Sequence, residues 1–211
     1  LPFKGSAVNY KNGANMVVTT SLSQVGKLLM DINTKYKGVK NVIIEDITHF
    51  FTKRTVDERK VTGFGKWMEL AASIKQNIID KEAILRDDLT LFVIGHVAEK
   101  KDKSGNPELS LHTPGKMLDN NIMIPSYFTY MLHTDLIENS DGTMQYRFQT
   151  NRTAFKVAKT PEGMFPLYIA NNYELIKRYI TAYQTNSEVD LTGIDEDINV
   201  SQETIKYTVP E

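Results

Sequence analysis

Two short apolar runs, each ending in polar side chains, constrain this chain more than any other feature of its sequence. Residues 42–44 are Val-Ile-Ile and precede Glu45 and Asp46, and residues 89–94 are mostly apolar and precede Gly95-His96. Apolar residues in these runs follow one another without alternation, which is typical of strands that a parallel sheet buries on both faces. The two runs therefore predict neighbouring strands of one sheet.

Helical spacing surrounds these runs. A short strand is expected over residues 14–20, and apolar residues then recur at i, i+3, i+4 and i+7 from Val25 to Ile32. Residues 63–86 and 171–184 carry two further apolar stripes of helical period. Alternating strands and helices predict an α/β fold, in which helices flank a mostly parallel sheet.

The second half of the chain has a different pattern. Residues 100–115 are charged and rich in turn-forming residues, which predicts a loop. Strands are expected over 130–137 and 144–150, and the turn Asn139-Ser140-Asp141-Gly142 joins them into a β-hairpin. We expect residues 1–184 to form the core and residues 185–211 to form an acidic tail.

Composition excludes several classes of protein. The 211 residues include 25 Lys or Arg against 26 Asp or Glu, so the net charge is −1 and only a local basic patch is possible. The absence of cysteine excludes disulfides and thiolate chemistry. No apolar run approaches the ~20 residues that a membrane-spanning helix needs, so we expect no membrane partner.

The polar residues at the strand ends predict a ligand site. Ligands of open α/β sheets bind just outside the carboxyl ends of the strands, where Glu45, Asp46 and His96 are expected. A carboxylate there can hold Mg²⁺ directly or through water, and its neighbour can orient an attacking water. A histidine on the next strand can sense a phosphate by hydrogen bonding. The alternative is that the acids only cap a helix and that the histidine is structural.

Basic residues in the connections suggest a nucleic-acid surface. Basic loops with nearby aromatic residues can bind one strand through phosphate contacts and base stacking. A solvated charged face is the alternative. The candidate residues are Lys100, Lys101, Lys103 and Lys116.

Phosphate-binding motifs are missing from the sequence. The dipeptide Gly-Lys occurs at 26–27, 65–66 and 115–116, but none of these has the earlier glycine and the following Ser or Thr of a P-loop. The dinucleotide-binding, zinc-protease and nucleophile-elbow motifs are also missing.

The order of the motifs resembles a known family. Residues 42–46 resemble a Walker B strand, and residues 92–96 resemble the sensor strand of RecA-like ATPases. Residues 113–119, 128–129 and 158–165, with a closing helix from Asn171, follow in an order similar to that of phage-encoded RecA-like ATP-binding proteins of the single-strand annealing and recombination type.

This resemblance implies a RecA-like P-loop NTPase core that binds ATP, Mg²⁺ and single-stranded DNA as a homo-oligomer in the cytoplasm of an infected bacterium. It also implies that a P-loop, within about thirty to forty residues, precedes Leu1. A non-catalytic nucleic-acid-binding, assembly or virion module on a decayed ATPase fold is the alternative.

The resemblance also assigns roles to residues. Glu45 matches the usual metal-coordinating acid and Asp46 the acid beside it. The common order places Asp first, so the division of labour between the two stays open. His96 takes the sensor position, and Lys159 matches a basic residue near a subunit boundary that stabilises transition-state charge on a neighbour's phosphates. Lys116 matches a strand-binding loop.

Overall fold

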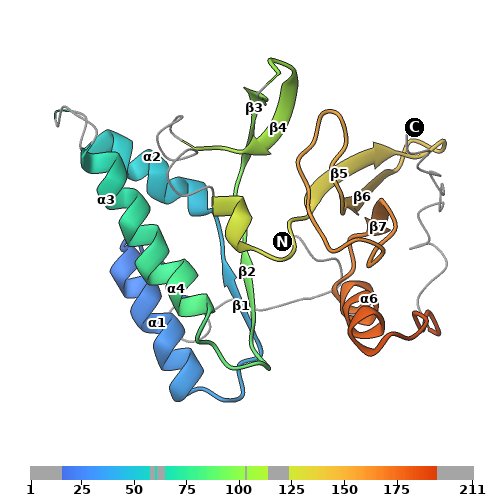
Figure 1. The fold of residues 1–211 in the computed structure, drawn as a ribbon, viewed down its shortest axis with the longest axis horizontal. Coiled ribbons are helices and arrows are strands. Elements are labelled where there is room, and N and C mark those ends of the chain that lie inside the picture. The colour runs from blue at the N-terminus through green and yellow to red at the C-terminus, as the bar shows by residue number, and fades with distance from the viewer. Residues whose placement is uncertain (1–15, 58–59, 61–64, 103, 114–123, 194–211) are drawn as a thin grey trace. The chain divides into compact units, whose positions relative to one another are not determined.

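The computed structural model describes residues 16–57, 60, 65–102, 104–113 and 124–193. The chain divides into two compact units. One contains residues 9–100 and 109–127, and the other contains residues 1–8, 101–108 and 128–211. Each unit is described by itself below, and Figure 1 gives the labels of their helices and strands.

The unit formed by residues 9–100 and 109–127 is built on a parallel pair of strands. β1 (Asn41–Ile44) pairs with β2 (Thr90–Val93) in the register Asn41 to Thr90 through Ile44 to Val93. The helical elements are α1 (Leu22–Thr34), α2 (Ile47–Asp57), α3 (Gly65–Ile74), the π-helical turn η1 (Lys75–Ile79), α4 (Asp80–Glu82) and the 3₁₀ turn η2 (Ile124–Tyr127).

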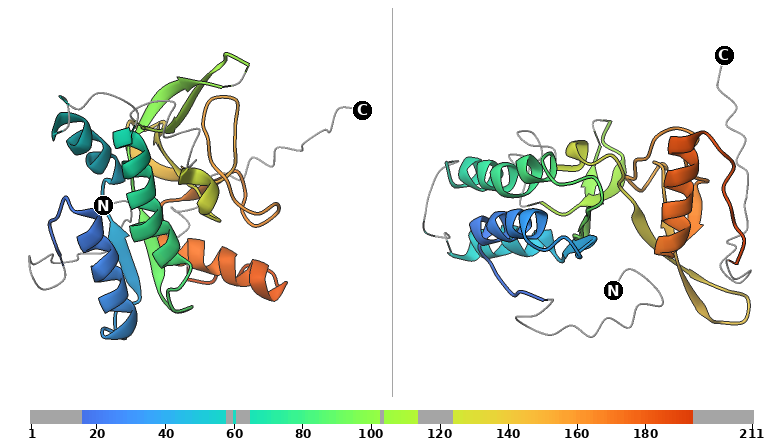
Figure 2. Two further views of the ribbon diagram at one scale, coloured as in Figure 1. Left: turned by 60° about the vertical axis from the view of Figure 1, so that its left-hand side comes forward. Right: turned by 90° about the horizontal axis from the view of Figure 1, so that it is seen from below.

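The helices α1 and α3–η1–α4 lie side by side next to the strand pair (Figures 1 and 2). Ser21 begins α1, because its hydroxyl accepts a hydrogen bond from the Gln24 amide. A β-carbon on Gly26 would lie 2.6 Å from Asn77 Oδ1, so glycine permits the close approach of α1 to η1. Fully buried Ile74 and Ile78 fill the space between the helices, as the predicted apolar stripe requires.

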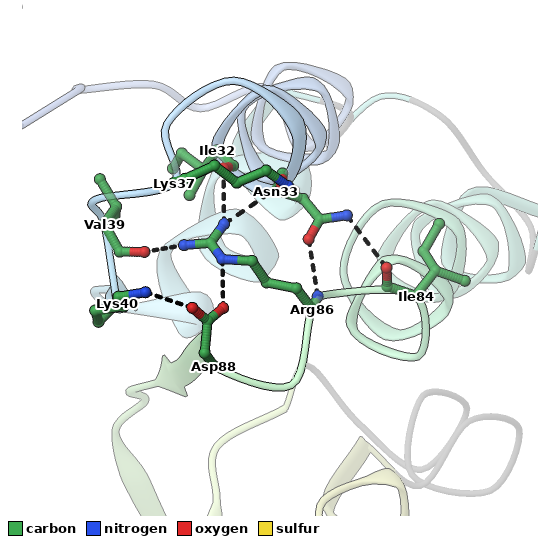
Figure 3. Close-up of polar contacts among 8 residues, drawn as sticks. All are labelled: Ile32, Asn33, Lys37, Val39, Lys40, Ile84, Arg86 and Asp88. Atoms are coloured by element: carbon green, nitrogen blue, oxygen red, sulfur yellow. Dashed lines mark hydrogen bonds and ion pairs between the residues drawn. The ribbon is translucent and has the colours of Figure 1, made fainter.

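The start of both strands is held by Arg86, whose side chain is 15% exposed (Figure 3). Its guanidinium donates to the carbonyl oxygens of Ile32 at 2.9 Å and of Val39, and it forms an ion pair with Asp88 at 2.5 Å. Asn33 accepts a hydrogen bond from the Arg86 amide at 2.8 Å. Arg86 therefore ties the end of α1 to the segments that enter β1 and β2.

The second unit contains an antiparallel sheet covered by a helix. β5 (His133–Glu138) pairs with β6 (Met144–Gln149), and β6 pairs with β7 (Tyr168–Ala170). α6 (Tyr173–Thr185) begins at Asn172, whose side chain accepts from the Leu175 amide. Phe148, Ile169 and Ile176 belong to the core between sheet and helix. The hairpin and the last helix confirm the sequence prediction.

The predicted mostly parallel sheet is not found. Among the described strands only β1 and β2 run parallel, and the chain is a mixed α/β protein with small sheets of two or three strands. Short turns such as the one between β5 and β6 reverse the chain, and a chain that reverses so sharply must pair antiparallel. Parallel pairing needs a long crossover, and the segment between β1 and β2, which contains α2, α3 and α4, provides one.

The local predictions were confirmed only in part. The predicted charged, turn-rich loop is a short turn in which Asp102 accepts hydrogen bonds from the Ser104 and Asn106 amides, and the unpredicted strands β3 (Val97–Lys101) and β4 (Pro107–Leu111) flank it. Residues 17–20 form no strand. The helix α2 was not predicted. Most of the predicted acidic tail lies outside the described residues.

Within the part of the chain that the structure describes, no helix is both long enough and apolar enough to cross a bilayer.

Candidate functional site at the carboxyl ends of β1 and β2

Asp46 and His96 lie together where the two parallel strands end. The ladder continues past the strands, since the Ile94 amide donates to Ile44 O at 2.9 Å and the Ile47 amide donates to Ile94 O at 2.8 Å. This pairing brings His96 Nε2 to 3.6 Å from Asp46 Oδ2. The sequence predicted that the two strand ends share one edge of the sheet, and the structure places these two side chains there.

The backbone of Asp46 is in the left-handed region, with φ 56°. Its Oδ1 accepts hydrogen bonds from the Thr48 hydroxyl and from the His49 amide, the latter at 3.2 Å, so one oxygen caps the first turn of α2. Oδ2 faces His96, and about a third of the side chain is exposed. Asp46 therefore combines the predicted cap with an oxygen that remains accessible to a ligand.

Glu45 points away from the core. Ile44 is buried, and Glu45 follows it as an exposed residue, as expected where a strand alternates its faces. His96 is also well exposed, at 76% of its side chain. The carboxylate of Glu45 and the imidazole of His96 are thus accessible to solvent.

Gly95 permits the close packing that creates this edge. A β-carbon at Gly95 would lie 2.6 Å from Leu111 Cδ1, 3.0 Å from Ile47 Cγ2 and 3.3 Å from Thr48 Cγ2. Any larger residue would therefore push the end of β2 away from the start of α2. In the sequence, Gly95 stands out only as the neighbour of His96. Its position between an apolar run and a polar residue was the signal that could have indicated close packing there.

The donor set at this edge is small. No group of three or more His, Asp or Glu side chains that could hold a metal ion occurs among the described residues. Two carboxylates, Glu45 and Asp46, are next to each other in the chain. Mg²⁺ commonly takes one or two protein carboxylates and completes its octahedron with water and phosphate oxygens, so the pair fits that ion when a phosphate is present.

The structure describes two of the four predicted strand-binding lysines. Lys100 Nζ donates to the Thr113 hydroxyl at 2.7 Å, while Lys101 is exposed at the end of β3. Lys103 and Lys116 lie outside the described residues. Of the two described lysines, Lys101 is the more exposed.

Lys159 belongs to the second unit. Its amide and carbonyl both bond to Met131, at 2.8 and 2.7 Å, and the residue before it, Ala158, is buried. Lys159 itself is exposed. The backbone around it is thus fixed against the start of β5.

A second cluster of charges, which the sequence did not suggest, lies on the sheet of this unit. Asp135 accepts hydrogen bonds from Lys156 Nζ at 2.5 Å and from the Arg147 guanidinium at 3.0 and 3.1 Å. Arg147 also stacks on Tyr168, 3.7 Å from the ring centre. All three charges are at least three-quarters buried, so this cluster stabilises the sheet and presents no open binding site.

Comparison with protein-family models, with curated proteins and with solved structures finds no match for this chain. The proposals below therefore rest on the geometry of the two units and on the motifs of the sequence.

Proposed function

We propose that this chain belongs to a phage RecA-like ATPase that binds ATP with Mg²⁺ and acts on single-stranded DNA in recombination or replication. One observation carries the proposal: two parallel strands deliver Asp46 and His96 to the same edge, with 3.6 Å between Nε2 and Oδ2. Ligands of α/β sheets bind at such edges. The order of the motifs supports the choice of a nucleoside triphosphate.

The residues at this edge suit phosphoryl transfer to water. Glu45 and Asp46 are the candidate acids: one would hold Mg²⁺, which supplies charge neutralisation on the phosphates, and the other would orient the attacking water. His96 lies 3.6 Å from Asp46 and would donate a hydrogen bond to a phosphate oxygen or to Asp46. No P-loop pattern occurs in residues 1–211, so no residue is assigned to the phosphate cradle.

The proposal includes a homo-oligomer. In it, Lys159 would contact phosphates bound to a neighbouring copy and stabilise charge in the transition state. The backbone hydrogen bonds between Lys159 and Met131 support this role. A side chain that reaches a neighbouring subunit is positioned accurately only if its own backbone is held.

The test is ATP turnover by the full-length protein, with and without single-stranded DNA. Asp46→Asn is a matched variant, because asparagine keeps the capping oxygen and tolerates the left-handed backbone. We expect turnover to fall by about 100-fold or more at unchanged stability. Glu45→Gln should behave similarly, whereas Asp57→Asn, in the exposed pair with Lys53, should keep wild-type turnover. Wild-type turnover in both Asp46→Asn and Glu45→Gln would refute the catalytic assignment.

The second candidate is a non-catalytic nucleic-acid-binding, assembly or virion module on a decayed ATPase fold. The absence of a P-loop from residues 1–211, and of a larger ligand group among the described residues, favours it. In that case the full-length protein binds single strands in a salt-dependent way, and ATP changes neither the affinity nor the salt dependence.

A further inference from the structure

The loop that follows β6 presents an aromatic ring to solvent. Phe155 is 63% exposed, and it is the one phenylalanine among the described residues that is largely exposed. Single apolar side chains on a surface are common, so the ring indicates a partner only together with the rigid loop and the charges near it.

The loop is ordered by a buried side chain. Gln149 is fully buried, and its Nε2 donates to Asn151 O at 2.8 Å and to Lys156 O at 3.3 Å. The Thr153 amide donates to Lys156 O, and the Lys156 amide donates to the Thr153 hydroxyl. These bonds close a turn with Phe155 at its tip. The ring is therefore held outward by a fixed backbone, which lowers the entropy that binding must overcome.

Basic residues are close to the ring in the sequence. Residues 151–160 contain Arg152, Lys156 and Lys159 and no acidic residue, but Lys156 is already paired with Asp135. Arg152 is 58% exposed and forms an ion pair with Glu108 at 2.8 Å, which joins the loop to the turn of the β3–β4 hairpin. Such an exposed pair contributes little to stability, so the guanidinium can exchange Glu108 for a phosphate at low cost.

The turn of that hairpin lies near Arg152. The pKa of Asp102 is lowered, first by the hydrogen bond from the Asn106 amide and to a smaller extent by the charge of Arg152. Lys101, at the end of β3, precedes this turn and is exposed. The loop and the hairpin turn together thus carry an exposed ring and exposed cations.

We propose that Phe155 is a stacking surface for a base of a single-stranded nucleic acid, and that Arg152 contacts the phosphate backbone next to that base. This inference rests on the nucleic-acid part of the proposed function and names the residues that carry it. A protein partner would also cover an exposed ring, but the segment carries two exposed cations, Arg152 and Lys159, and no acidic residue, which favours a polyanion.

The experiment measures the affinity of the full-length protein for a labelled oligothymidylate of about 20 nucleotides by fluorescence anisotropy, at low salt and without nucleotide. Phe155→Ala should weaken binding roughly 5- to 100-fold, the range for loss of one stacked base. Phe155→Leu, which keeps an apolar side chain but no aromatic face, should weaken it similarly. Phe155→Trp should bind at least as tightly as the wild type. Arg152→Gln should weaken binding and reduce its salt dependence.

Tyr36→Ala is the matched control, since Tyr36 is 59% exposed on the other unit, and it should bind as the wild type does. Three outcomes would each overturn the inference: no binding by the wild type, wild-type affinity in Phe155→Ala, or wild-type affinity in Phe155→Leu. The last outcome would indicate an apolar protein partner. The two proposals can fail independently. ATP turnover without DNA tests Asp46, whereas the binding of oligothymidylate tests Phe155.

Discussion

Arg147 lies directly opposite Asp135 in the β5–β6 ladder, and its guanidinium donates two hydrogen bonds to one oxygen of that carboxylate. Lys156 occupies the other oxygen. One largely buried carboxylate therefore pairs with two cations, one from the neighbouring strand and one from the loop that carries Phe155. This charge and the hydrogen bonds of Gln149 together hold that loop.

Replacing Asp135 by Asn should lower the free energy of unfolding by about 3 kcal/mol, because two partly buried cations lose their counter-ion. Urea denaturation at neutral pH measures the change. Asp31→Asn is the control, since its pair with Lys35 lies on the surface of α1 and should contribute far less to stability. Equal losses in the two variants would contradict the role given to Asp135.

The same carboxylate predicts a loss of stability in acid. Burial alone would raise the pKa of Asp135, but the hydrogen bonds from Lys156 and Arg147 outweigh it, and the pKa lies below its ordinary value of 3.8. The stabilisation is therefore complete above the unfolded pKa and is lost as the pH falls through the folded one. The difference in stability between the wild type and Asp135→Asn should shrink as the pH falls below 3.8. A constant difference would contradict this assignment.

His133 predicts a second dependence on pH. Burial is the main cause that lowers its pKa, the charge of Lys156 adds to it, and Asp135 opposes both. The unfolded chain then binds a proton before the folded chain does, so stability falls as the pH is lowered through the unfolded value of 6.5. Melting temperatures between about pH 7.5 and about pH 5.5 should fall less steeply for His133→Gln than for the wild type. Identical slopes would show that another group is responsible.

Gly95→Ala should destabilise the protein by about 1–3 kcal/mol, because the new methyl group overlaps Leu111 and Ile47. It should also reduce ATP turnover, because the end of β2 would move away from Asp46. Gly65→Ala is the control: nothing lies within 4 Å of a β-carbon there, and alanine at the start of α3 should be neutral or stabilising. Thermal melts and turnover assays of both variants test the pair.

Arg86→Met should cost about 2–4 kcal/mol, because carbonyl oxygens at the end of α1 and before β1 lose a charged donor and Asp88 loses an ion-pair partner. Lys40 also binds Asp88 but is more than half exposed, so Lys40→Met should cost under about 1 kcal/mol. Comparable losses would mean that Arg86 is only one of several equal contacts.

The strand ends were accessible to sequence reasoning because their signal is local. An apolar run followed by polar residues marks where a buried strand emerges, and parallel pairing brings two such ends to one edge. The cap on α2 was among the alternatives read from the sequence, and its partners Thr48 and His49 follow Asp46 closely in the chain. The left-handed backbone of Asp46 was not predicted.

α2 was missed because its composition opposes a helix. Three threonines and a valine lower the helix propensity of residues 47–57. Ile47, Phe50 and Phe51 are buried at the spacing i, i+3 and i+4, and this burial outweighs the propensity. That spacing was present in the sequence and was the signal that could have identified the helix.

The contacts of Arg86 and Gln149 could not be predicted from the sequence. Both side chains bind backbone carbonyl oxygens, and these acceptors occur at every residue. Only the folded chain determines which of them point at a given side chain. The same holds for Asp135, whose partners come from a neighbouring strand and a loop.

The π-helical turn at Lys75–Ile79 has a consequence for the residues that follow. Such a turn acts as a one-residue insertion that the helix accommodates without forming a loop. Each residue of a helix rotates the chain by about 100°. Because the extra residue is absorbed within one turn, the residues on either side of it keep their helical faces. Deleting one residue here should therefore restore a regular helix and leave Arg86 directed at α1.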